Sequence, residues 1–167
     1  MSSLIIENAT LFTGVDGDVI DDGVVYVSDG FIRFAGPKTK VPSSLEDIDR
    51  FDAAGKFVMP GMTESHVHLS YNNAHPQQLN SQPLATAMLD AVDNARVLLG
   101  SGFTSAISFG SAQGLDVPLR DAINSGRIPG PRLAASDRDL GSTGSNADGT
   151  FGGDNSKKII ADGPWAI

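Results

Sequence analysis

The chain has 167 residues, of which 40% are hydrophobic and 19% are charged. This length can bury one ordinary domain, or a small domain with part of a larger one, and the composition is too apolar for a disordered chain. The formal net charge is −8, and the 12 Lys and Arg residues form no cluster, which argues against nucleic acid or an anionic membrane as the main partner.

The sequence contains no cysteine, so disulfides, thiolate metal ligands and cysteine nucleophiles are excluded. The N-terminus lacks a basic segment followed by a long apolar one, and no apolar run approaches the roughly 20 residues that span a bilayer. We therefore expect a cytoplasmic protein without a membrane partner.

The first third of the chain is predicted to form β-structure. Short runs of β-branched and aromatic residues alternate with turn signals such as Asp29-Gly30 and Gly36-Pro37. This spacing predicts a small antiparallel sheet or sandwich within residues 1–58, with solvated acidic turns. The expected strands lie at 4–6, 19–20, 24–27, 31–34 and 56–58.

The pattern changes after Pro60-Gly61. Apolar residues recur every three or four positions from Leu84 to Leu99 and predict a helix, and a shorter helix is predicted from Val117 to Ile123. Strand–helix–strand–helix–strand with short connections is the pattern of a parallel α/β sheet. The expected strands lie at 64–69, 104–109 and 132–135.

Two later segments are less regular. Residues 139–156 are rich in Gly, Ser, Asn and Asp, and we expect a long functional or mobile loop there. The final residues, 162–167, have the features of a helix start, with Asp or Gly near the N-cap and Pro in the first turn. An isolated first turn is not a stable end for a domain, so we expect this chain to be part of a longer protein.

The strongest chemical signal is the segment Pro60-Gly61-Met62-Thr63-Glu64-Ser65-His66-Val67-His68-Leu69. Residues two apart in a strand point to the same face, so His66 and His68 are expected to project together. Two neutral imidazoles on one rigid edge can bind a single divalent ion such as Zn²⁺. The pair alone is also compatible with two histidines that merely lie in a β surface.

The context of the pair resembles the signature of the amidohydrolase superfamily, in which Pro-Gly, a hydrophobic residue and an acidic residue precede His-x-His-Leu. The resemblance continues in order along the chain. Gly102-Phe103-Thr104-Ser105 is similar to the family's entry to barrel strand two, and Ile128-Pro129-Gly130-Pro131-Arg132-Leu133 is similar to strand three of the imidazolonepropionase-like and prolidase-like branch. Ala161-Asp162-Gly163-Pro164 resembles that branch's next helix start.

This resemblance implies an α/β fold, a (β/α)₈ TIM barrel with a small N-terminal β-sandwich domain. The chain would hold the sandwich segment, residues 1–58, and about the first three βα units of an incomplete catalytic barrel, residues 59–167. His66 and His68 match the family's first two metal ligands and are the predicted metal site. The catalytic general acid or base is expected beyond Ile167.

Three further residues are site candidates. Glu64 occupies the family's acidic position. It is expected to contact the metal-binding histidines without binding the ion itself, or else to be a surface or strand-capping carboxylate. His75 and Tyr71 lie in the loop after the first barrel strand, over the expected site, and are predicted to contact substrate. The alternative for His75 is a solvated loop histidine.

Two segments depart from the branch. It often carries an Arg-Asp pair at the end of strand two, where this chain has Ser108-Phe109-Gly110. It also often carries a Thr-Gly-Gly-His-Gly-like segment after strand three, where this chain has Thr143-Gly144-Ser145-Asn146-Ala147-Asp148-Gly149 and no histidine. Because these loops shape the pocket, the substrate cannot be carried over from any one relative.

The implied activity is metal-dependent hydrolysis of an amide or other C–N bond through a metal-activated water. The expected cofactor is one or two divalent ions, zinc in the first instance. The expected partners are a small-molecule substrate and the remainder of the barrel, in the same polypeptide or a second chain, and we expect a homo-oligomer. Two alternatives stay open: a non-catalytic scaffold with the amidohydrolase fold, and a stand-alone binding module.

Overall fold

The structure, a computed structural model, describes residues 3–15, 17–42, 48–73, 82–145 and 158–166. The chain divides into two compact units, Met1–Pro60 and Gly61–Ile167. Among the described residues, no helix is long and apolar enough to cross a membrane.

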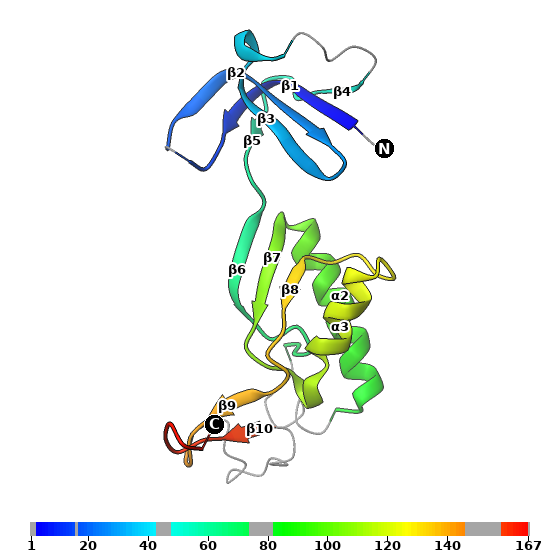
Figure 1. The fold of residues 1–167 in the computed structure, drawn as a ribbon. Helices are drawn as coiled ribbons and strands as arrows, with labels where there is room; N and C mark the ends of the chain where they lie inside the picture. The colour runs from blue at the N-terminus through cyan, green and yellow to red at the C-terminus, as the bar shows by residue number, and fades with distance from the viewer. Residues whose placement is uncertain (1–2, 16, 43–47, 74–81, 146–157, 167) are drawn as a thin grey trace. The chain divides into compact units, whose positions relative to one another are not determined.

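The first unit is a five-stranded sheet of order β3-β2-β1-β4, with β5 also paired to β1 (Figure 1). The strands β1 and β2, and β2 and β3, are antiparallel, but β4 and β5 run parallel to β1. The elements are β1 (Ser3–Phe12), β2 (Val19–Ser28), β3 (Phe31–Pro37), η1 (Lys38–Lys40), β4 (Asp49–Asp52) and β5 (Phe57–Val58).

The prediction of an antiparallel sheet is therefore wrong for two of its strands. The long connection between β3 and β4 lets the chain return to the free edge of β1 in the same direction as β1. All four residues of β4 are exposed. Its sequence, Asp-Arg-Phe-Asp, carries little strand signal, so pairing with β1 is what makes it a strand.

The strand β1 contains an irregularity at Asn8, where its register with β2 shifts and φ is 56°. Asn tolerates positive φ better than most residues. Its side chain donates to Asp52 Oδ1 at 3.0 Å and accepts from Lys38 Nζ at 3.1 Å. Asp52 Oδ1 also accepts from the Ala54 N–H at 2.8 Å. These hydrogen bonds stabilise the charged carboxylate and so lower the pKa of Asp52. The bond from the Ala54 N–H has the larger effect and the bond from the Asn8 side chain the smaller one.

The second unit contains a parallel sheet of order β6-β7-β8 with a helix in each connection. This confirms the predicted strand–helix–strand–helix–strand pattern, with small changes at the element ends. The elements are β6 (Met62–Val67), α2 (Leu84–Gly100), β7 (Phe103–Ser108), η2 (Ala112–Gly114), α3 (Asp116–Asn124) and β8 (Arg132–Ala134).

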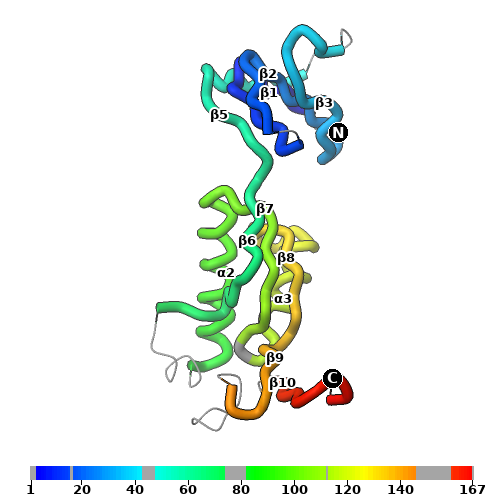
Figure 2. Tube along the Cα trace, turned by 90° about the vertical axis from the view of Figure 1, so that its left-hand side faces the viewer, coloured from blue at the N-terminus to red at the C-terminus, as the bar shows by residue number. Residues whose placement is uncertain are grey.

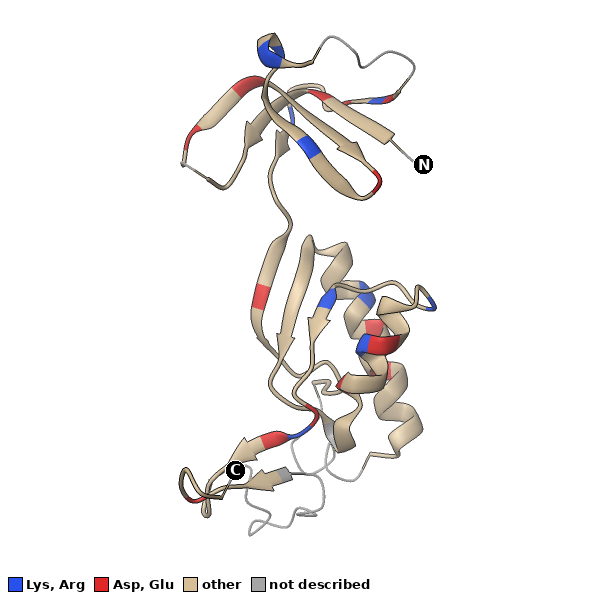
Figure 3. Ribbon diagram, viewed as in Figure 1, with Lys and Arg blue, Asp and Glu red and all other residues tan. Residues whose placement is uncertain are grey.

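Both helices cover the same face of this sheet (Figures 1 and 2). The side of α2 that is buried consists of three alanines, whose small side chains let the helix lie close to the strands. We call the apolar cluster between the helices and the strands the helix-facing layer; its buried members are Leu69, Ala91, Ala95, Ala106, Leu119 and Leu133. In Figure 3 the central strand β7 carries no charged residue, whereas α3 carries several.

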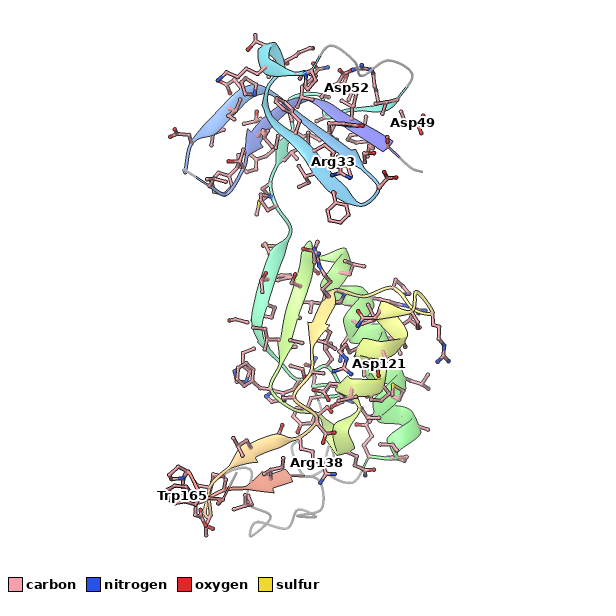
Figure 4. All side chains as sticks on the ribbon, viewed as in Figure 1. Arg33, Asp49, Asp52, Asp121, Arg138 and Trp165 are labelled. Carbon is pink, nitrogen blue, oxygen red and sulfur yellow. The ribbon has the colours of Figure 1, made fainter. Side chains whose placement is uncertain are left out.

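A second, two-stranded parallel sheet pairs β9 (Asp139–Gly141) with β10 (Lys158–Ile160). The predicted loop 139–156 thus begins as a strand, because pairing with β10 orders its first residues; residues 146–157 lie outside the described part. The predicted helix start near the C-terminus is a turn in the described residues, with the Ala166 N–H donating to the Gly163 carbonyl at 3.0 Å. Trp165 in this turn is 98% exposed (Figure 4).

Candidate functional site

The carboxyl ends of β6, β7 and β8 and the residues after them meet at one edge of the parallel sheet, as expected for parallel strands. We call this edge the rim; it comprises residues 66–71, 109–111 and 136–139. The rim brings together His66 and His68, whose Nε2 atoms lie 3.2 Å apart. The expectation that the two histidines project together is thus realised in the structure, whereas their role as metal ligands stays a prediction.

Each imidazole ring is held by neighbours from other parts of the rim. The ring of Phe109 stacks on His66 with centroids 4.5 Å apart and 8° between the planes. The ring of Tyr71 stacks on His68 at 5.1 Å and 20°. His68 Nδ1 lies 3.0 Å from the carbonyl oxygen of Gly110. A carbonyl can only accept, so Nδ1 carries the proton, and Nε2 of a neutral His68 carries a lone pair that can accept from His66 Nε2 or bind a cation.

The spacing of the two Nε2 atoms fits a shared metal ion. Each imidazole nitrogen binds zinc at about 2.0–2.1 Å, and two such ligands 3.2 Å apart subtend about 100° at the ion, close to the tetrahedral angle. A catalytic site normally needs at least three protein ligands. The described residues contain no group of three or more His, Cys, Asp or Glu side chains that could hold an ion. The pair is therefore a partial donor set.

Glu64 lies close to the histidines in sequence but contacts the backbone rather than a ring. Its Oε1 accepts from the His66 backbone N–H at 3.3 Å. The register between β6 and β7 shifts between Glu64 and Val67, so simple alternation does not place Glu64 on the face of His66. A supporting role for Glu64 stays a prediction, and the structure adds a local backbone contact.

Tyr71 has a partner within the protein. Its hydroxyl donates to Asp139 Oδ2 at 3.1 Å. Burial raises the pKa of the Tyr71 phenol above its ordinary value, and the neighbouring Asp139 carboxylate raises it further. The predicted substrate contact of Tyr71 is untested, and His75 lies outside the described residues.

Three rim residues lie against the histidines in the structure, although the sequence did not predict these contacts. Phe109 and Gly110 follow β7, and Asp139 begins β9 with its Oδ1 3.6 Å from His68 Nδ1. The available signal was positional, because each of them lies at or after the carboxyl end of a predicted strand of the parallel sheet. That signal marks a neighbourhood and does not identify individual contacts.

A pocket of about 850 Å³ opens beside the two histidines. This volume lies within the range of small-molecule sites. Figure 4 shows Arg138 at the approach to β9, in the segment that bounds this pocket. The lining residues are His66, His68, Phe109, Ser136, Arg138, Asp139, Leu140, Gly141, Ser145 and Ile159.

No family model matches the chain. An imidazolonepropionase from a Bradyrhizobium species is 36% identical over 103 residues, which are 60% of this chain and 24% of that protein. The crystal structure of an amidohydrolase is similar with a TM-score of 0.74 and 31% identity, covering 88% of this chain and 34% of that one. A Xaa-Pro dipeptidase with methionine bound in its active site gives a TM-score of 0.79 and 26% identity, covering 99% of this chain and 42% of that one.

These likenesses establish a relationship to the amidohydrolase superfamily, as the motifs predicted. The relatives are hydrolases that act on C–N bonds. The chain spans less than half the length of each of the three proteins.

Proposed function

We propose that the protein is a metal-dependent hydrolase that cleaves an amide or other C–N bond of a small molecule. In this proposal β6, β7 and β8 are the first strands of a (β/α)₈ barrel, and the first unit is part of a β-sandwich. The superfamily relationship supports the reaction class. The observation that carries the proposal is the convergence of His66 Nε2 and His68 Nε2 to 3.2 Å at the rim.

The two histidines would hold the ion, which we expect to be zinc, alone or as one of two divalent ions. A bound divalent ion supplies Lewis-acid chemistry, polarising a carbonyl and lowering the pKa of water toward about 7. Further ligands and the carboxylate that moves the proton to the leaving nitrogen would come from side chains other than the described ones.

The chain's own residues prepare this half of the site. The Gly110 carbonyl fixes the His68 tautomer. The ring of Phe109 stacks on one face of His66 and the ring of Tyr71 on one face of His68, which limits the rotation of both imidazoles. A fixed tautomer and orientation remove entropy that binding would otherwise cost. The pocket beside the histidines leaves room for a small substrate.

Metal binding by the intact protein tests this function. Metal-free protein is titrated with Zn²⁺ in a calorimeter, and a panel of N-acyl amino acids, dipeptides and cyclic amides is assayed for hydrolysis. His66→Asn and His68→Asn should each lose tight binding and hydrolysis. The chain has three histidines, so His75→Asn is the matched control and should bind zinc as the unmodified protein does. Equal zinc affinity in all four proteins would overturn the proposal.

A non-catalytic scaffold with the same fold is the second candidate. One observation favours it: Ser108-Phe109-Gly110 stands where the related branch often has Arg-Asp. A scaffold would bind no metal, or bind it without hydrolysing any member of the panel. A stand-alone binding module would bind a small molecule without metal.

A further inference from the structure

Asp139 begins β9, and the rim brings its carboxylate beside the imidazole of His68. The Oδ1 atom lies 3.6 Å from His68 Nδ1, and the Asp139 and His68 side chains are 20% and 29% exposed. The other oxygen, Oδ2, accepts from the Tyr71 hydroxyl at 3.1 Å. One carboxylate oxygen is thus held in place while the other faces the histidine.

The oxygen that faces His68 is buried and has no hydrogen-bond partner in the part of the chain that the structure describes. Buried acceptors are nearly always paired, because an unpaired one keeps its full desolvation penalty. A donor lies close by. The His68 Nδ1–H, whose nitrogen is 3.6 Å from this oxygen, donates to the Gly110 carbonyl at 3.0 Å. A shift of a few tenths of an ångström would let this N–H serve both acceptors.

A cation on Nε2 changes the balance between these two acceptors. It withdraws electron density from the imidazole and makes Nδ1–H a stronger donor, and a carboxylate attracts such a donor more strongly than a neutral carbonyl does. We propose that Asp139 is a positioning residue that accepts the His68 Nδ1–H together with the Gly110 carbonyl, and so aims the Nε2 lone pair at a divalent ion. This inference rests on the proposed function, because it requires the ion.

Tyr71 anchors this arrangement. Its ring stacks on His68 and its hydroxyl holds Asp139, so one side chain contacts both partners. The loop that carries Tyr71 is tied to α2, because Asn94 Nδ2 donates to the carbonyls of Leu69 and Tyr71 at 2.8 Å each. Asp139 is therefore held by the hydroxyl of Tyr71, whose backbone is in turn fixed to α2.

The test measures how tightly and with what geometry the intact, metal-free protein binds Co²⁺, by calorimetry and by visible absorption. Asp139→Asn should weaken Co²⁺ binding about 10–100-fold and alter the absorption bands, because the His68 ring loses its charged acceptor. Tyr71→Phe should give a smaller loss of the same kind. The control is Asp93→Asn, which changes an exposed carboxylate on α2 that pairs with Arg96 outside the rim, and should bind Co²⁺ as the unmodified protein does.

A second measurement needs no variant. In protein that is loaded with Zn²⁺, the Nδ1 proton of His68 should move downfield in the NMR spectrum relative to the metal-free protein. An unchanged resonance, or unchanged Co²⁺ affinity and absorption in a folded Asp139→Asn protein, would overturn the role of Asp139. If His68→Asn binds Co²⁺ as well as the unmodified protein does, the proposed function itself fails, and the role of Asp139 fails with it.

Discussion

The helix-facing layer and the rim are built from the same three strands but depend on different kinds of contact. Val67 packs against the layer, whereas its neighbours His66 and His68 belong to the rim. The buried members of the layer are all apolar, so hydrophobicity and size determine their contribution. The rim depends on directed hydrogen bonds and ring contacts between distant segments. The comparison indicates that stability and candidate chemistry can be changed separately.

The largest expected effect is on the layer. Leu119 on α3 is 1% exposed, and Leu119→Ala should lower the free energy of unfolding by about 2–5 kcal/mol, because it removes buried contacts and leaves a cavity. Leu89→Ala, at a position on α2 that is 66% exposed, is the matched control and should change stability by less than about 0.5 kcal/mol. Urea unfolding measures both. A changed zinc affinity in the folded Leu119→Ala protein would break the comparison.

The next effect is expected at Gly110, a buried residue of the rim. Its φ is 123°, and a Cβ there would collide with Asp139 and the backbone of Arg138. Gly110→Ala should lower the free energy of unfolding by about 2–4 kcal/mol, through backbone strain and overpacking together. It should also weaken metal binding, since the Gly110 carbonyl would shift away from His68.

Gly126→Ala separates the backbone strain of a positive φ from the steric clash that Gly110→Ala adds. Gly126 has a φ of 71°, and a Cβ there would meet nothing within 4 Å. This control should cost about 1–2 kcal/mol in stability and leave metal affinity unchanged. Equal effects of the two glycine variants on metal binding would show that the close approach at Gly110 does not matter for the rim.

A smaller loss is expected at Asp116, which ties the segment after β7 to the segment after β8. The residue is 1% exposed; its Oδ1 lies 3.0 Å from the Ser111 hydroxyl, and its Oδ2 accepts from the Ser136 N–H at 3.1 Å. Asp116→Ala leaves the Ser136 N–H without this acceptor, while the Ser111 hydroxyl keeps the Asp137 carbonyl at 3.1 Å, and the change should cost about 1–3 kcal/mol in thermal or urea unfolding. Asp121→Ala on the exposed side of α3 (Figure 4) should be nearly neutral, and a similar loss there would contradict the explanation.

The smallest effect is a pH dependence at Asp52 in the first unit. Its pKa is lowered in the folded protein, mainly by the Ala54 N–H, so its contribution to stability is present above the ordinary value of 3.8 and is lost as the pH falls through the folded value. The stability gap between the unmodified protein and Asp52→Ala should therefore narrow between pH 6 and pH 3. Asp49→Ala in the same strand (Figure 4) controls for loss of charge. A gap that stays constant with pH would refute this assignment.

The helix-facing layer could be predicted from the sequence because local periodicity specifies it. The apolar spacing from Leu84 to Leu99 and the flanking strands predicted β6, α2, β7, α3 and β8 to within a few residues, but not β9 and β10. The strand β4 could not be predicted, because its four exposed residues become a strand only through pairing with β1. Tertiary pairing overrides weak local preference there.

The rim could be predicted in part. His66 and His68 follow from strand alternation and from the resemblance to known motifs. Asp139 could not be predicted as their neighbour, since its contact with Tyr71 joins residues 68 positions apart and no local pattern marks it. The register shift between Glu64 and Val67 could not be predicted either, because a bulge leaves no periodic signal in a strand of six residues.

The exposed turn that carries Trp165 has a practical consequence for spectroscopy. This is the only tryptophan in the sequence, and it is 98% exposed. Its indole fluorescence should emit at the long wavelengths of a fully hydrated ring and be quenched freely by iodide, so it will respond little to the loss of the helix-facing layer. A blue shift on binding would instead report that another surface has covered this end of the described chain.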